Sequence, residues 1–158
     1  LPISDHRVVV GVVSSPALAR RWSAAEGNGA YLAANGNGAK KLHVSAISSL
    51  DDAQLSYSDL MGWGNRKDAM LALQERVWRT RGIGDFWSHM LVAEGAVDIA
   101  VEPILALWDM AALDIIVREA GGRFSNLEGV DGPRGGNGVS SNGLLHEKFL
   151  ATLNTGLK

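Results

Sequence analysis

The segment 109–120 restricts the possible folds more than any other part of the chain. After Asp109 it is largely apolar, and Asp114 and Arg118, four residues apart, are its main polar exceptions. Gly121-Gly122 follows directly, which is typical of a helix C-terminus. A helix that is apolar on most sides has to be buried between other elements, so this segment predicts a layered α/β structure.

The first third of the chain predicts an antiparallel sheet. Residues 8–13 form an apolar, mostly β-branched run, which indicates a strand buried on both faces. Gly27-Asn28-Gly29 is a turn signal between two further strands, and residues 35–38 form a second Gly/Asn turn before the alternating segment 42–45. We therefore expect a β-meander over residues 8–45.

The rest of the chain alternates between strand and helix patterns. Helices are expected at 67–78, at 85–94 with Asp85 as N-cap, at 109–120 and at 144–153. Strands are expected at 54–60, 97–101, 123–127 and 139–142, with a loop at 129–138. No linker divides these elements, so we expect a single α/β unit with a mixed sheet flanked by helices.

Composition excludes several classes of protein. The 158 residues are 46% apolar with a net charge of −2, and no apolar run approaches the roughly 20 residues of a membrane span. Basic residues do not gather in a stripe, which argues against nucleic acid as a partner. The chain has no Cys, so disulfides, thiolate nucleophiles and Cys-ligated zinc are excluded. We expect a cytoplasmic protein that binds neither membrane nor nucleic acid.

Acidic residues are concentrated in the second half of the chain. Seven of the 17 fall between positions 85 and 119: Asp85, Glu94, Asp98, Glu102, Asp109, Asp114 and Glu119. Oxygen ligands without Cys favour a hard cation such as Mg²⁺, if a metal is bound. We interpret Glu94, Asp98, Asp114 and Glu119 as helix caps or members of solvated faces. Asp109 is either an N-cap or a carboxylate that holds a cation where the helix N-terminus faces an anion such as phosphate, and its spacing alone favours the cap.

Other candidate groups form no catalytic pattern. The four histidines share no metal-binding spacing: His6, His43, His89 and His146. We interpret His89 as a packed or half-exposed side chain. The serines lie in no Gly-x-Ser-x-Gly nucleophile motif. Trp87 is interpreted as a core residue rather than as a wall of a substrate site.

Two short motifs carry a resemblance to a known family. Trp108-Asp109-Met110-Ala111-Ala112, followed by Glu119-Ala120-Gly121-Gly122, resembles the C-terminal signature of inositol-monophosphatase-like enzymes, Mg²⁺-dependent phosphatases of small phosphomonoesters. The similarity extends over nearly the whole chain, including the segments 11–13, 26–30, 81–84 and Gly143. It implies an α/β/α/β/α sandwich, a small phosphorylated substrate, Mg²⁺ as cofactor and a homodimer.

Within this family the chain most resembles the actinobacterial histidinol-phosphate phosphatases. The similar segments are 81–87, 92–100 and Glu102-Pro103. In place of the small residues common in inositol monophosphatases, Asp85-Phe86-Trp87 follows Gly84. The resemblance implies hydrolysis of histidinol phosphate, with an inositol or sugar phosphate as the alternative substrate.

The resemblance also implies roles for five residues. Asp109 would be a Mg²⁺ ligand and catalytic residue that faces the substrate, and Glu102 would lie against the polar groups of the substrate. An acid at Glu102 or Asp85 would suit the cationic amine of histidinol phosphate, although Asp85 is equally well explained as a helix cap. Gly84 would belong to the substrate wall. Arg81 would orient the substrate or contact a partner subunit, and a structural salt bridge explains it at least as well.

One departure from the family concerns the metal site. The other metal ligands of the family, a Glu and an Asp-Pro-x-Asp-Gly-Thr loop, precede the strand matched by residues 8–13, and this sequence lacks them. Because Mg²⁺ takes about six oxygens, Asp109 alone cannot form its site. We therefore expect residues 1–158 to be the C-terminal part of a phosphatase without its N-terminal metal-binding part, leaving apolar surface that this part would cover. A non-catalytic fragment or binding subunit is the remaining alternative.

Overall fold

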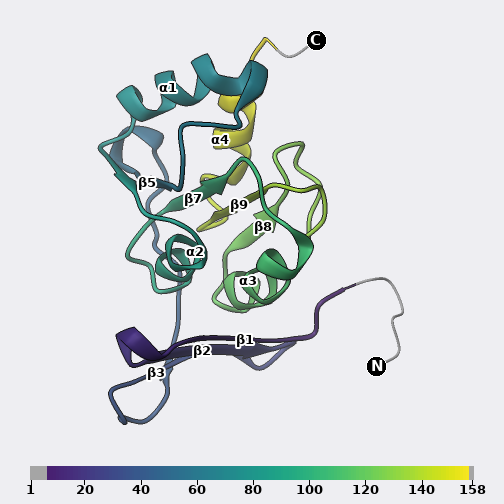
Figure 1. Cartoon of the computed structure of the whole chain (residues 1–158). Helices are drawn as coiled ribbons and strands as arrows, with labels where there is room; N and C mark the ends of the chain where they lie inside the picture. Colours follow the sequence, from purple (N-terminus) through teal and green to yellow (C-terminus); the bar gives the residue numbers. More distant parts are fainter. Residues whose placement is uncertain (1–6, 157–158) are drawn as a thin grey trace.

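The computed structural model describes residues 7–156 and has four layers (Figure 1). A four-stranded sheet forms one end of the molecule. Helices α2 (Phe86–Ala93) and α3 (Leu107–Glu119) lie between it and a five-stranded sheet, whose other face is covered by α1 (Lys67–Arg76) and α4 (His146–Leu153). The expected layered α/β architecture is confirmed. No helix in the described part of the chain is long and apolar enough to span a bilayer.

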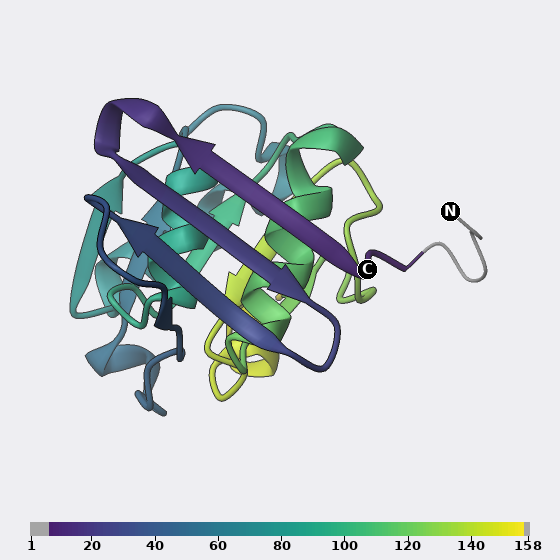
Figure 2. The ribbon, with the colours of Figure 1, turned by 90° about the horizontal axis from the view of Figure 1, so that it is seen from below.

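The four-stranded sheet is the expected β-meander. Its order is β1-β2-β3-β4 and all neighbours are antiparallel; the strands are β1 (Val10–Ser15), β2 (Arg20–Ala25), β3 (Gly29–Ala34) and β4 (Lys40–Lys41). Figure 2 shows its three long strands lying across α2 and α3. Trp22, Ala24, Ala30 and Leu32 are buried and pack with apolar residues of the two helices in one core.

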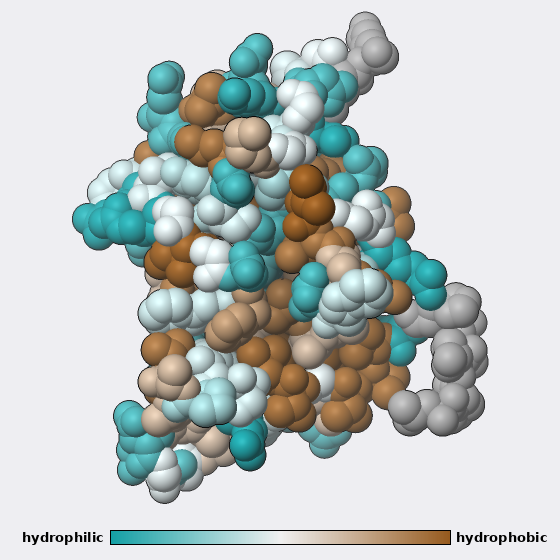
Figure 3. Space-filling view, viewed as in Figure 1, coloured by the Kyte–Doolittle hydropathy of each residue, from teal (hydrophilic) through white to brown (hydrophobic). Residues whose placement is uncertain are grey.

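The expectation that the first strand is buried on both faces is wrong. Within β1 only Gly11 is buried, whereas Val10 and Val12 are 63% and 55% exposed. The strand forms one edge of the sheet and packs on helices with one face only, because no described residue covers the other. In Figure 3, apolar residues accordingly gather on the lower part of the surface, over β1. Gly11 allows the close approach to α3, since a Cβ there would lie 2.5 Å from Cγ2 of Ile115.

The five-stranded sheet is mixed and has the order β6-β5-β7-β9-β8. β5 (Gln54–Tyr57) is parallel to β6 (Arg79–Gly82) and to β7 (Ile99–Glu102), and β9 (Gly138–Ser141) is antiparallel to β7 and to β8 (Arg123–Ser125). β7 is central and all four of its residues are buried. Short 3-10 turns occur at Pro16–Leu18, Leu50–Asp52 and Gly64–Arg66.

Strand β6 was not expected from the sequence, which predicted a helix as far as residue 78. The helix ends at Arg76 because Val77 adopts an extended conformation with ψ of 154°. Trp78 then lies outside the helix and is 59% exposed, with the Arg79 guanidinium 4.3 Å from its ring centroid. Trp78 has the spacing of an apolar helix residue, but it is not part of the helix.

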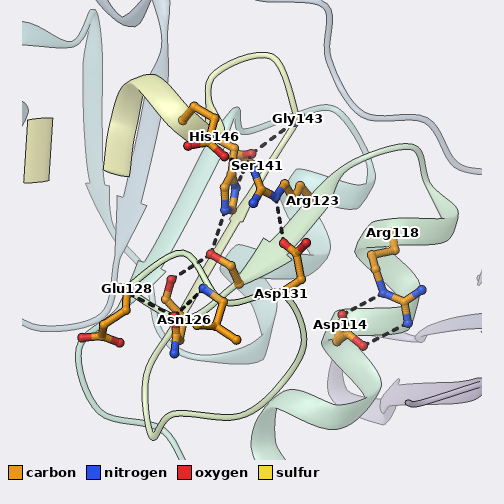
Figure 4. Close-up of polar contacts among 12 residues, drawn as sticks. Asp114, Arg118, Arg123, Asn126, Glu128, Asp131, Ser141, Gly143 and His146 are labelled. Atoms are coloured by element: carbon orange, nitrogen blue, oxygen red, sulfur yellow. Dashed lines mark hydrogen bonds and ion pairs between the residues drawn. The ribbon is translucent and has the colours of Figure 1, made fainter. Parts of the chain in front are cut away.

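Two of the four acids assigned to caps or solvated faces are buried. Asp114 is 1% exposed and pairs with Arg118 at 2.8 Å on the next turn of α3 (Figure 4). Asp98 is 3% exposed and accepts hydrogen bonds from the Gln54 backbone N–H at 2.7 Å and from the Ser45 hydroxyl. Both carboxylates are structural and are satisfied by protein groups rather than by water: Asp114 by Arg118 of the same helix, and Asp98 by residues from distant segments.

The other two acids also bind distant segments. Glu94 accepts hydrogen bonds from Arg20 at 2.7 Å and from the Trp22 indole N–H at 2.8 Å, and so ties α2 to the meander. Glu119 accepts the backbone N–H groups of Gly27 and Gly29 at 3.0 and 2.8 Å. These N–H groups, Gly27 first, hold the pKa of Glu119 below its usual range. Glu94 does occupy the C-cap position of α2, as the cap interpretation allows, but neither side chain belongs to a solvated face, because both carboxylates bind distant segments.

His146 anchors α4 to the five-stranded sheet. Its Nε2 lies 2.8 Å from Oγ of Ser125 and its Nδ1 lies 2.9 Å from Oγ of Ser141 (Figure 4). Ser125 donates its own proton to the Asn126 carbonyl, so Nε2–H donates to Ser125 and Ser141 donates to Nδ1. Burial, with a smaller effect of Arg123, lowers the pKa of His146 to about 4. The neutral ring is a structural group.

Candidate active site

A cavity of about 400 Å³ opens where the parallel strands β5 and β7 end. Its walls come from the segment after β5, the start of α2, the end of β7 and the first turn of α3: Ser58, Asp59, Met61, Asp85, Glu102, Pro103, Ile104, Leu105 and Asp109. Sites at the carboxyl ends of parallel strands are common because the loops that follow the strands converge there. The cavity, called the acidic pocket below, brings together three predicted site residues: Asp85, Glu102 and Asp109.

Glu102 is the buried carboxylate of the acidic pocket. It is the last residue of β7 and only 2% of it is exposed. Its Oε2 accepts a hydrogen bond from the Ser58 hydroxyl, and its Oε1 has no hydrogen-bond partner in the described part of the chain. Burial raises the pKa of Glu102 to about 7; the Ser58 hydrogen bond opposes this shift, and the charges of Asp85 and Asp59 add to it. An unpaired buried oxygen of this kind is well placed to receive a donor from a ligand.

Asp109 occupies the third position of α3 rather than its N-cap. The helix begins at Leu107, and Ala106 is the N-cap. One oxygen of the Asp109 carboxylate accepts the Ala106 backbone N–H at 3.1 Å, while the residue itself is exposed and lines the acidic pocket. The side chain therefore stabilises the helix start through one oxygen and leaves the other facing solvent. The N-cap interpretation is therefore wrong in position, although the side chain still stabilises the helix start, and the metal-ligand interpretation stays a prediction.

Asp85 precedes α2 at the N-cap position but makes no capping hydrogen bond with its side chain. It is exposed and lines the acidic pocket. Asp85 thus occupies the predicted N-cap position without capping through its side chain, and its contact with a substrate stays a prediction.

Arg81 and Gly84 lie near the acidic pocket without lining it. The exposed Arg81 donates from Nη1 to the Thr80 carbonyl at 2.7 Å, and none of the ion pairs among residues 7–156 involves it. A structural salt bridge is thus not its role within the described chain. Gly84 packs against the pocket wall, since a Cβ there would lie 3.2 Å from Cβ of Ser58.

Sequence reasoning missed part of the pocket wall, notably Ser58, Asp59, Met61 and Ile104. The predicted strand ran to residue 60, whereas β5 ends at Tyr57. Ser58-Asp59 therefore comes directly after a buried parallel strand, and this position was the available signal. Ile104 and Met61 are 71% and 72% exposed and form an apolar rim.

The described residues do not by themselves form a magnesium site. No three His, Asp or Glu side chains converge as metal ligands among residues 7–156. Mg²⁺ requires about six oxygens at close to octahedral positions, and Asp109 offers one that is free of backbone contacts. His89 and His146 are fully buried, and Nδ1 of His89 lies 2.6 Å from Oγ of Ser140, so neither is placed to bind a metal. His6 lies outside the described residues.

The fold and the acidic pocket define a layered α/β protein with a carboxylate-lined cavity at the ends of parallel strands. The model of the inositol monophosphatase family matches residues 3–157. The chain belongs to this family, which confirms the resemblance carried by residues 108–112 and 119–122.

Curated relatives and a solved structure agree with this assignment. A protein named histidinol-phosphatase from Mycobacterium tuberculosis is 54% identical over 156 residues, covering 98% of this chain and 60% of the relative. One of the same name from Streptomyces coelicolor is 53% identical over 151 residues, covering 94% and 57%. The Thermotoga maritima IMPase superposes with a TM-score of 0.82 at 30% identity, covering 96% of this chain and 58% of that structure. The chain thus spans about 60% of the length of the curated relatives and matches their C-terminal part.

Proposed function

We propose that the protein to which this chain belongs hydrolyses L-histidinol phosphate to L-histidinol and phosphate, with Mg²⁺ as cofactor, as a step of histidine biosynthesis. The observation that carries the proposal is the acidic pocket, in which a buried Glu102 with one unpaired oxygen lies among the exposed carboxylates Asp59, Asp85 and Asp109. The identity of 54% and 53% to two proteins named histidinol-phosphatase supports it.

The pocket suits a substrate with a cationic amine and an anionic phosphate. An ammonium group donates three hydrogen bonds, and the unpaired Oε1 of Glu102 offers an acceptor for one of them. Charge-assisted bonds of this kind are stronger than neutral ones. The polyol ring of inositol carries no charge that would compensate the burial of Glu102.

A phosphate group beside Asp109 would be repelled by carboxylates unless a cation lies between them. This electrostatic requirement supports Mg²⁺ as cofactor, with Asp109 as one ligand and the remaining protein ligands in a part of the protein that precedes this chain. Bound Mg²⁺ activates water and stabilises the charge that develops on the phosphate. Asp109 holds its carboxylate at the α3 N-terminus, where the helix dipole also favours an anion.

Two alternatives have specific support. A Thermotoga maritima relative named fructose-1,6-bisphosphatase/inositol-1-monophosphatase is 32% identical over 157 residues, which supports an inositol or sugar phosphate as substrate. The lack of three converging metal ligands among the described residues supports a chain that is non-catalytic by itself. By family resemblance we also propose a cytoplasmic homodimer, and light scattering of the purified protein tests the dimer.

The test compares two substrates and two forms of the protein. We expect the 158-residue chain alone to release no phosphate, and activity to appear when the N-terminal part of the Mycobacterium tuberculosis relative is added or fused. With Mg²⁺, kcat/KM for histidinol phosphate should exceed that for inositol 1-phosphate by at least about 100-fold, the effect of about 3 kcal/mol from a buried charge-assisted bond. Equal rates for the two substrates would contradict the histidinol assignment. Phosphate release by the chain alone would contradict the divided metal site.

A further inference from the structure

Two buried serines lie next to each other and bind β6 and the segment that connects β6 to α2. Ser56 of β5 and Ser88 of α2 are both 0% exposed, and their Oγ atoms are 2.8 Å apart. The Ser88 hydroxyl donates to the Ile83 carbonyl, and Oγ of Ser56 lies 3.2 Å from the Arg81 carbonyl. Ser88 of α2 therefore holds the connecting segment at Ile83, and Ser56 of β5 links Ser88 to Arg81 in the neighbouring strand β6.

The available protons determine which serine is the donor in the hydrogen bond between Ser56 and Ser88. Each serine has one hydroxyl proton, and the proton of Ser88 goes to the Ile83 carbonyl. The proton of Ser56 is then shared between Oγ of Ser88 and the Arg81 carbonyl. The backbone N–H of Ile83 also donates to the Tyr57 carbonyl at 3.0 Å, so both polar backbone groups of Ile83 are fixed. Linked hydrogen bonds of this kind strengthen one another in a buried setting.

The position of Ile83 affects two residues that line the acidic pocket, Ser58 and Asp85. Gly84 follows Ile83 and packs on Ser58, where a Cβ would come within 3.2 Å of Cβ of Ser58. Ser58 in turn donates to Glu102, and Asp85 follows Gly84. A shift of the Ile83 carbonyl would therefore move Asp85 and release the surface against which Ser58 is held.

We propose that Ser88, supported by Ser56, is a positioning residue that sets the distance between Asp85 and the Ser58–Glu102 pair and thereby the affinity of the pocket for the amine of the substrate. The proposal rests on the proposed function for its substrate. Ser88 touches no residue of the pocket wall through its hydroxyl, so its effect is exerted through the backbone of residues 83–85.

Ser88→Ala in the catalytically complete protein tests the proposal, with Ser140→Ala as the matched control. Ser140 is equally buried and binds His89, the neighbour of Ser88 on α2, but makes no contact with the connecting segment. We expect Ser88→Ala to raise KM for histidinol phosphate about tenfold, as expected for a lost or weakened hydrogen bond, with kcat changed less than about twofold. The hydrolysis of p-nitrophenyl phosphate, which has no amine, should be unchanged. Ser140→Ala should lower the melting temperature similarly without changing KM.

A second measurement needs no substrate. The carboxyl carbon resonance of Glu102, followed by NMR against pH, should titrate near 7 in the wild-type protein and at lower pH in Ser88→Ala, because a loosened wall admits water to the carboxylate. If the wild type does not hydrolyse histidinol phosphate, the proposed function is wrong and this titration alone decides the role of Ser88. The positioning role is overturned if Ser88→Ala leaves both KM and the titration midpoint at wild-type values, or if Ser140→Ala changes them equally.

Discussion

The Ser58 hydroxyl donates a hydrogen bond to Oε2 of Glu102, while Oε1 of the same carboxylate is buried without a hydrogen-bond partner among residues 7–156. Ser58 directly follows β5 and Glu102 ends the neighbouring parallel strand β7, and the two residues are 44 positions apart in the sequence. One oxygen of this buried carboxylate is thus satisfied by the protein, and the other has no partner in the described part of the chain.

This arrangement predicts that Glu102 makes stability depend on pH. Burial, reinforced by Asp85 and Asp59, raises the pKa of Glu102 to about 7, so the folded state favours the protonated form. Stability from this group is complete below the pKa of an unfolded glutamate, about 4.3, and is lost as the pH rises through 7. We expect Glu102→Gln to be more stable than the wild type above pH 8 by roughly 3 kcal/mol and to show a flatter profile. Melting temperatures between pH 5 and 9 measure this effect, with the exposed Glu75→Gln as control.

Asp109→Asn should separate the proposed catalytic role of Asp109 from its hydrogen bond to the helix start. An Asn oxygen can still accept the Ala106 N–H, so the free energy of unfolding should change by less than about 1 kcal/mol. If Asp109 is the proposed Mg²⁺ ligand, turnover of the complete protein should fall at least about 100-fold, because an amide is a weaker ligand than a carboxylate. Kinetics with Mg²⁺ and urea unfolding measure the two effects. Asp68→Asn, in the first turn of α1, is the control. Near wild-type turnover in Asp109→Asn would leave Asp109 as a helix cap only.

The buried ion pair of α3 should contribute to stability. Asp114 is 1% exposed and pairs with Arg118, so Asp114→Asn leaves a guanidinium without its counterion. We expect a loss of about 2–3 kcal/mol, below the usual cost for fully buried pairs because Arg118 reaches solvent. Asp131→Asn breaks the more exposed pair with Arg123 and should cost less than about 1 kcal/mol. Urea unfolding of the two variants compares them, and equal losses would indicate that Asp114 is solvated after all.

Gly11→Ala should weaken the packing of the meander on α3. The added Cβ would lie 2.5 Å from Cγ2 of Ile115 and 3.0 Å from the Ala112 carbonyl oxygen, so β1 or α3 has to shift. Overpacking of this kind costs about 1–3 kcal/mol. Gly38→Ala is the control, since nothing lies within 4 Å of its added Cβ. Thermal unfolding measures both variants, and an unchanged melting temperature for Gly11→Ala would mean that β1 adjusts freely.

The sequence by itself determined the features that depend on neighbouring residues. The apolar stretch of α3 with its Gly121-Gly122 stop, the turn at Gly27-Asn28-Gly29 and the family motif around Asp109 were all read correctly. Helix periodicity and turn chemistry are local, since the hydrogen bonds that define them join residues a few positions apart. Asp109 was predicted as a metal ligand in this way because its motif is contiguous, and that role stays a prediction.

Tertiary structure decided which polar groups are buried and which residues form the pocket. Asp98 can be buried because Ser45 and Gln54, from distant segments, donate hydrogen bonds to its carboxylate. No local sequence pattern predicts such partners. Ser58 and Glu102 meet because β5 and β7 are parallel and adjacent, an arrangement that depends on the crossover through α1, β6 and α2. Long-range pairing and the exclusion of water, rather than residue type, gave Glu102 its raised pKa and its unpaired oxygen.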